Sequence, residues 1–215
     1  MKTNILVVGV GGQGVILLST IIGRALTLAG LDVVIGETKG LARRGGSVEA
    51  HIKVGDSYTS PLIPKGLADA VLALELLEGL RYIPWLKRGG CAVISVERVP
   101  PINTFLYDEE KYPSIDDAVM TLRSLAKKYN YKVYLVNPLK YAIKVGNPLT
   151  SNVVMLGFLS RILNLNIKEE YMVEAIKSSV PSKTIDDNIK AYKMGVEYAN
   201  NALTKNRQED IIIDT

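Results

Sequence analysis

The strongest constraint on the fold of this chain is a short apolar strand that runs into a cluster of glycines and then into a long apolar helix. Residues 4–10, NILVVGV, are mostly β-branched, which is typical of a strand buried on both faces of a sheet. Apolar side chains then recur at helical spacing over residues 13–29. The glycines at the junction are Gly9, Gly11, Gly12 and Gly14. A strand, a glycine turn and a helix in this order predict the first unit of a doubly wound α/β sheet.

The remaining periodicities extend this unit into one domain. Further strands are predicted at residues 31–37, 47–55, 68–75, 91–97 and 131–137, and further helices at 76–87 and 115–129. From Asn147, which reads as a helix N-cap before Pro148, no strand is predicted and helices run to about Asn201. We therefore expect a Rossmann-like, mostly parallel sheet with a helical C-terminal third. The domain is predicted to span residues 1–203, with a polar C-terminal tail at 204–215.

The composition excludes several classes of function. A single cysteine, Cys91, rules out an internal disulfide and any zinc or iron–sulfur site built from cysteines of this chain, and fits a reducing cytoplasm. No apolar run reaches the roughly 18 residues that a membrane span requires. The net charge is only +4, with acidic and basic residues interspersed. We therefore expect a cytoplasmic protein without bound metal that binds neither membranes nor nucleic acid.

The glycine turn has two interpretations. Gly9, Gly11 and Gly14 fit the dinucleotide-binding pattern G-x-G-x-x-G between a strand and a helix, where backbone N–H groups and the helix dipole bind phosphate. Glu37, at the end of the next predicted strand, is placed like the acid that binds the ribose of NAD. The alternative is a turn that serves only close packing.

A second anion site is predicted beside the first. Arg43 and Arg44 lie in a glycine-flanked loop at the same edge of the sheet, where adjacent guanidinium groups can bind a phosphate; the alternative is a solvated pair. Gly12 and Gln13 open the glycine turn further than NAD binding demands. Two anion sites on one edge favour a ligand with separated phosphates.

Three further side chains stand out. His51, the only histidine, falls on the polar side of its predicted strand, so we expect it to be exposed or at an interface rather than catalytic. Asn152 lies in an apolar helix and must be hydrogen-bonded, either to a loop or within a ligand cleft. Cys91 opens an apolar strand and is expected in the core.

These motifs carry a family resemblance. The segments concerned are GVGGQGV at 9–15, GLARRGGSVEAHIK at 40–53, NPLTSNVVMLG at 147–157 and KTIDDNIKAYKMG at 183–195. In this order they resemble the γ subunit or domain of 2-oxoacid:ferredoxin oxidoreductases, and within that family the small (beta) subunits that act with indolepyruvate. The resemblance covers roughly residues 4–200.

The resemblance implies a division of labour. Partner subunits hold thiamine diphosphate and iron–sulfur clusters, decarboxylate the 2-oxoacid and reduce ferredoxin, while the γ domain helps to enclose coenzyme A and has no catalytic residue of its own. Coenzyme A carries a pyrophosphate, which we assign to the glycine turn, and a 3′-phosphate, which suits Arg43 and Arg44 unless these bind the partner. The predicted site residues are Gly9, Gly11, Gly12, Gln13, Gly14, Arg43, Arg44 and Asn152. The alternative function is a stand-alone NAD(P)-binding protein.

Overall fold

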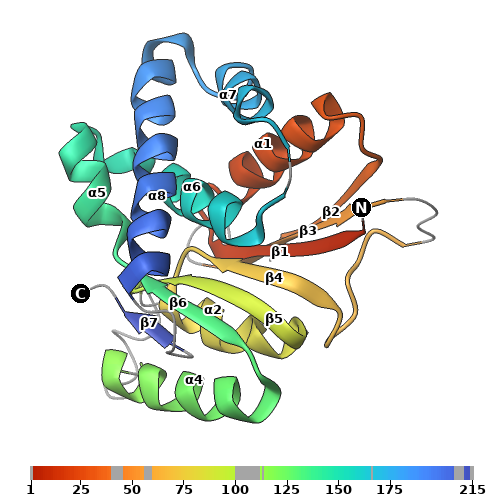
Figure 1. The fold of residues 1–215 in the computed structure, drawn as a ribbon, viewed down its shortest axis with the longest axis vertical. Helices are drawn as coiled ribbons and strands as arrows, with labels where there is room; N and C mark the ends of the chain where they lie inside the picture. The colour runs from red at the N-terminus through yellow and green to blue at the C-terminus, as the bar shows by residue number, and fades with distance from the viewer. Residues whose placement is uncertain are drawn as a thin grey trace.

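The computed structural model describes residues 2–39, 46–55, 60–99, 112, 114–165, 167–205 and 211–213. They form one seven-stranded sheet between two layers of helices (Figure 1). The strands are β1 (Thr3–Val10), β2 (Val33–Lys39), β3 (Ser47–Val54), β4 (Ala68–Ala73), β5 (Leu86–Ser95), β6 (Lys132–Val136) and β7 (Ile211–Ile213). The α-helices are α1 (Val15–Leu28), α2 (Leu76–Tyr82), α4 (Ile115–Tyr129), α5 (Pro138–Val145), α6 (Ser151–Leu163), α7 (Glu169–Lys177) and α8 (Ile185–Lys205). Short 3-10 helices are η1 (Ile83–Trp85), η3 (Pro148–Thr150) and η4 (Ser182–Thr184).

The predicted mostly parallel, doubly wound sheet is confirmed. The strand order is β2-β3-β1-β4-β5-β6-β7, and the pairs from β1 through β4, β5 and β6 to β7 are parallel. The exception is β3, which runs antiparallel to both β1 and β2. A β2–β3 hairpin is therefore inserted beside β1, and β2 becomes an edge strand.

Alternating side chains of the central strands build two separate cores. On β1, Ile5 and Val7 face the layer of α1, α6, α7 and α8, whereas Leu6 and Val8 face α2 and α4 (Figure 1). All four of these side chains are fully buried. Burial on both faces explains why the strand reads as a continuous apolar run, as the sequence predicts.

Some boundaries differ from the sequence predictions. The helix expected over 76–87 stops at Tyr82, because Pro84 has no N–H to continue it, and a 3-10 turn leads directly into β5 at Leu86. The expectation of no strand after Asn147 is wrong, since β7 pairs in parallel with β6. The N-cap expected at Asn147 is confirmed, because its side chain accepts a hydrogen bond from the Leu149 N–H. No helix in the described ranges has both the length and the apolar character that a membrane crossing demands.

Helices α6 and α8 cross with their backbones in contact. A Cβ atom added at Gly157 of α6 would lie 2.0 Å from the carbonyl oxygen of Tyr192, and one added at Gly195 of α8 would lie 2.0 Å from that of Val154. Only hydrogen atoms fit at both positions, so these glycines fix how closely α6 sits on α8. Because α6 begins at the carboxyl ends of the strands, the crossing with α8 also fixes the position of the first residues of α6.

The expectation that His51 is exposed is wrong. His51 is only 3% exposed, and its Nδ1 accepts a hydrogen bond from the Ile63 N–H at 3.1 Å. Its Nε2 lies 3.7 Å from Glu49 Oε1. The segment around Ile63 covers this face of β3 and could not be predicted from the alternation within the strand. Burial lowers the pKa of His51; Glu49 opposes this and Lys53 adds to it.

This arrangement predicts a pH-dependent stability. Protonation of Nδ1 removes the acceptor for the Ile63 N–H, and a folded pKa below the ordinary 6.5 means that the unfolded chain binds the proton more tightly. The stabilisation that neutral His51 gives to the folded state is therefore complete above pH 6.5 and is lost as the pH falls through the lowered pKa. We expect the difference in unfolding free energy between wild type and His51→Gln to be flat above this value and to shrink below it in urea denaturation. Parallel pH profiles of the two proteins would contradict this role.

Candidate functional site

A cavity of about 160 Å³ opens at the carboxyl edge of the sheet. The chain leaves β1 for α1 on one face and leaves β4 for α2 on the other, so this edge is a switch point where open α/β sheets bind ligands. The walls come from the glycine turn, from the ends of β4 and β5, and from the starts of α5 and α6. Segments far apart in the sequence thus meet at the predicted location.

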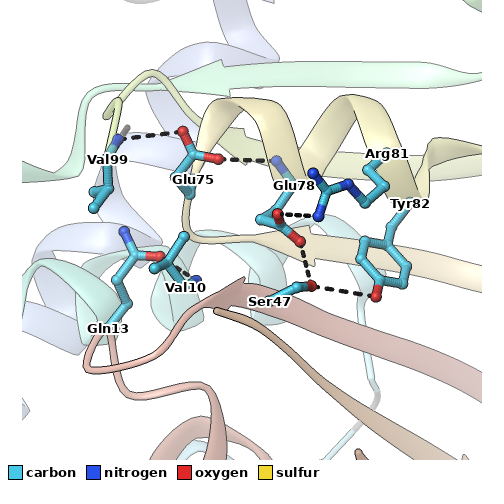
Figure 2. A network of polar contacts seen from close by, with 8 residues as sticks. All are labelled: Val10, Gln13, Ser47, Glu75, Glu78, Arg81, Tyr82 and Val99. Carbon is cyan, nitrogen blue, oxygen red and sulfur yellow. Dashed lines mark hydrogen bonds and ion pairs between the residues drawn. The ribbon is translucent and has the colours of Figure 1, made fainter. Parts of the chain in front are cut away.

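The glycine turn is closed by its own glutamine. The Val10 N–H donates to Gln13 Oε1 at 2.8 Å, and Gln13 Nε2 donates to the Leu74 carbonyl oxygen at 2.9 Å (Figure 2 shows the first bond). A Cβ at Gly9 would lie 2.9 Å from Gln13 Oε1 and 3.2 Å from Leu74 Cβ. Gly9 therefore makes room for the Gln13 side chain, which ties the turn to the end of β4.

Asn152 joins α6 to the same turn. Its Nδ2 donates to the Gln13 carbonyl oxygen at 3.1 Å, and the residue also lines the cavity. Gly14, the N-cap of α1, has φ +88°, and a Cβ there would lie 2.2 Å from Asn152 Nδ2. Of the two roles predicted for Asn152, the bond to a loop is thus present, and it is made at the wall of the cleft.

Gly12 has open space beside it, unlike Gly9 and Gly14 of the same turn. It has φ +103°, and a Cβ there would meet no atom within 4 Å. The Gly11 N–H already donates to the Gly46 carbonyl oxygen at 2.9 Å, and the Gln13 N–H to that of Val10 at 3.1 Å. For the Gly12 N–H, the described residues provide no acceptor. This N–H stands next to the first turn of α1, where the helix dipole favours an anion.

Arg43 and Arg44 lie outside the described residues. The loop that contains them is described from Gly46, whose bond to Gly11 joins the start of β3 to the glycine turn. Glu37, the predicted ribose-binding acid, accepts a hydrogen bond from Ser19 Oγ at 3.2 Å. Its strand is separated from β1 by β3, whereas the dinucleotide fold places the acid on the strand next to β1. This geometry disfavours NAD.

A polar network around α2, which the sequence did not predict, connects this helix to the start of β3 and to the segment after β5 (Figure 2). Glu75 caps the helix by accepting from the Glu78 N–H at 2.9 Å, and it also accepts from the Val99 N–H at 3.3 Å. Glu78 accepts from Ser47 Oγ at 2.5 Å and pairs with Arg81 at 2.9 Å, while Ser47 Oγ lies 3.3 Å from the Tyr82 hydroxyl. Acidic residues directly after an apolar strand were the available signal.

Glu97, after β5, contributes a carboxyl group to the cavity wall. Its Oε1 is buried and has no hydrogen-bond partner among the described residues. Burial raises the pKa values of both Glu97 and Glu75. The described residues contain no group of three or more acids, histidines or cysteines able to hold a metal ion. The site therefore offers a ligand the Gly12 N–H, the Ser151 hydroxyl, the Asn152 Oδ1 and the Glu97 carboxyl group.

The chain is similar to known proteins in sequence and in fold. Residues 4–198 match the family model described as pyruvate ferredoxin/flavodoxin oxidoreductase. Indolepyruvate oxidoreductase subunit IorB of Archaeoglobus fulgidus is 42% identical, over 93% of this chain and 96% of that protein. The subunit of the same name from Pyrococcus horikoshii is 36% identical, over 93% and 97%. A solved structure, the gamma subunit of a keto/oxoacid ferredoxin oxidoreductase from Geobacter sulfurreducens, is similar with a TM-score of 0.68 and 27% identity, over 93% of this chain and 99% of that one.

Proposed function

Because the chain belongs to the pyruvate ferredoxin/flavodoxin oxidoreductase family, we propose that it is the subunit of a 2-oxoacid:ferredoxin oxidoreductase that helps to enclose coenzyme A. The relatives named IorB support indolepyruvate, or another aryl pyruvate, as the 2-oxoacid. In this proposal, partner subunits carry thiamine diphosphate and iron–sulfur clusters, decarboxylate the substrate and reduce ferredoxin in a reducing cytoplasm. Coenzyme A supplies the thiol that takes up the acyl group.

The observation that carries the proposal is the open N–H of Gly12 at the mouth of the cavity. A phosphate group there would accept a hydrogen bond and lie at the positive end of α1. The other predicted residues of the turn support this position: Gly9 and Gly14 make room for Gln13 and Asn152, and Gly11 holds the start of β3. Arg43 and Arg44 remain assigned to a second phosphate or to the partner.

The surroundings of the cavity support a site shared with a partner. Its volume of about 160 Å³ is below the roughly 300 Å³ at which complete small-molecule sites begin. Leu149, which lines it, is 88% exposed, and Leu139 and Ile143 of the adjacent α5 are 40% and 59% exposed. An exposed leucine on the cavity wall, with exposed apolar side chains on the helix that begins beside it, is typical of a surface that another chain covers. We propose that the thiamine-bearing subunit covers this rim.

Replacing both arginines tests the proposal in the assembled enzyme. With Arg43→Ala/Arg44→Ala, we expect the half-saturating concentration of coenzyme A to rise at least about tenfold, because hydrogen bonds from charged groups to a phosphate are lost. The half-saturating concentration of the 2-oxoacid should not change. Lys127→Ala/Lys128→Ala removes the same charge from α4 and is the matched control. An unchanged dependence on coenzyme A in the arginine variant, with the complex intact, would refute the assignment of these arginines to a phosphate.

A further inference from the structure

The strand β2 lies at the edge of the sheet and lacks the features that usually keep an edge strand from pairing with another chain. It pairs with β3 over seven consecutive positions without a shift in register, so it contains no bulge. It contains no proline, and its residues from Val33 to Gly36 carry no charge. An edge strand of this length without such features is a template for a strand of another chain.

The backbone of β2 directs hydrogen-bonding groups toward this edge. In an antiparallel pair, hydrogen-bonded and non-hydrogen-bonded positions alternate. The Gly55 N–H donates to the Asp32 carbonyl oxygen at 2.9 Å, and these two residues directly continue the register of β2 and β3. The hydrogen-bonded positions of β2 are therefore the even-numbered ones. Val33 and Ile35 direct their N–H and C=O groups away from β3, toward the open edge.

Exposed apolar side chains accompany these backbone groups. On the face that α1 covers, a groove of about 530 Å³ runs beside β2, and Gly23, Leu28 and Ile35 are among the residues that line it. Leu28 and Ile35 are exposed, and so is Val34 on the other face of the strand. Apolar side chains gathered on a surface in this way are typical of a protein–protein interface.

The charges of the groove suit a second copy of the same chain. Among the described residues that line it, Arg24 is the one basic residue and Glu174 is the one acidic residue. In a two-fold pairing each surface meets its own counterpart, so a surface with a single sign of charge would repel itself. A groove with one charge of each sign can instead bring opposite charges together across the axis.

The position of β2 leaves room for this pairing in an assembled enzyme. The two edges of the sheet are β2 and β7, and α5 lies on the opposite side of the molecule from β2 (Figure 1). The rim that we assign to the thiamine-bearing subunit includes α5. Two copies joined through β2 would therefore leave both of these rims free.

We propose that two copies of the chain pair through their β2 strands, antiparallel and about a two-fold axis at Ile35, so that the two sheets become one. The outward N–H and C=O groups of each Ile35 then bond to those of the other, and the two exposed side chains pack together beside the grooves. An axis at Glu37 would instead set two carboxylates face to face. The inference goes beyond the proposed function, since it involves neither coenzyme A nor the 2-oxoacid.

Sedimentation velocity of the purified full chain tests the inference. We expect a dimer at high protein concentration that dissociates on dilution. Ile35→Lys brings two like charges together at the axis, so it should raise the dissociation constant of the dimer at least about tenfold. Met120→Lys places the same charge at an exposed apolar position of α4 and is the matched control, for which we expect no change.

A cross-link tests the register and does not depend on the folding of the lysine variant. Residues in a hydrogen-bonded antiparallel pair have Cα atoms about 5.5 Å apart, which is within the reach of a disulfide. Cys91→Ala first removes the natural thiol. In this background, oxidation of Ile35→Cys should link two chains on a non-reducing gel. Val33→Cys lies on the same edge and face but off the axis, so it should not link them.

Each of the other outcomes overturns the inference. A chain that is monomeric at every concentration refutes it, as does a dimer that Ile35→Lys does not weaken. Cross-linking of Val33→Cys as fast as that of Ile35→Cys would show random encounters or another register. If the chain alone is monomeric and Ile35→Lys weakens its co-purification with the thiamine-bearing subunit, the edge binds that subunit and not a second copy.

Discussion

The substitution Gly157→Ala is expected to lower the free energy of unfolding by at least about 3 kcal/mol, at the upper end of the range for overpacked cores. The added methyl carbon would lie 2.0 Å from the Tyr192 carbonyl oxygen and 3.1 Å from Gly195 Cα. Both are backbone atoms of α8, so no side chain can rotate away and the two helices must separate. Urea denaturation of the purified chain measures the loss.

A second glycine provides the matched control. Gly79→Ala also adds a methyl group to a glycine within a helix, but the nearest atoms there, from 2.5 Å, belong to the Ile94 side chain. Alanine gains up to about 1 kcal/mol in helix propensity at either position. Because a side chain can shift where a helix backbone cannot, we expect Gly79→Ala to cost at least about 1 kcal/mol less than Gly157→Ala. Equal losses for the two variants would show that the α6–α8 crossing is not limited by backbone contact.

The substitution Gly14→Ala is expected to cost about 2–4 kcal/mol, from a strained positive φ and the loss of one hydrogen bond. Its Cβ would displace Asn152 Nδ2 from the Gln13 carbonyl oxygen and so release α6 from the glycine turn. Gly30→Ala introduces the same kind of backbone strain, because φ is +77° at Gly30 and +88° at Gly14. Its added Cβ, however, would meet no atom within 4 Å. The difference between the two variants therefore measures the collision with Asn152.

A double mutant completes this test. Once Asn152→Ala has removed the amide, Gly14→Ala no longer collides with it. Adding Gly14→Ala to Asn152→Ala should then cost only what Gly30→Ala costs. Should Gly14→Ala in the wild-type background cost no more than Gly30→Ala, the proposed coupling between the turn and α6 would be wrong.

The architecture could be predicted because it follows from local patterns. Residues 4–10 read as a doubly buried strand, and residues 115–129 coincide with α4 as it is observed. The direction of β3 was missed, although the information was in the sequence. The segment between β2 and β3 is shorter than the dozen or more residues that a parallel crossover needs, so a hairpin was the only connection available.

The location of the site could be predicted from the sequence, but the role of each of its residues could not. The glycine pattern predicts a turn at the sheet edge, and the structure has one there. The individual roles depend on partners that no local pattern contains: Gln13 folds back on Leu74, and Asn152 reaches the turn from 139 positions away. The fold buries Glu75 and Glu78 and half-buries Glu97, and the local sequence does not show these surroundings. Contacts between distant segments decided their environment, and those contacts follow from packing rather than periodicity.

The order of the elements along the chain has a consequence for synthesis on the ribosome. The helices α2 and α4 that cover one face of the sheet are complete by Tyr129, before β6 is made. On the other face, α1 alone is early, and α6, α7 and α8 arrive only with residues 151–205. A nascent chain that has completed β6 therefore carries an assembled sheet with much of one apolar face bare, a species prone to aggregation. Chaperone capture, stalled translation and nonsense mutations should all act most strongly on this protein in the interval between β6 and the end of α8.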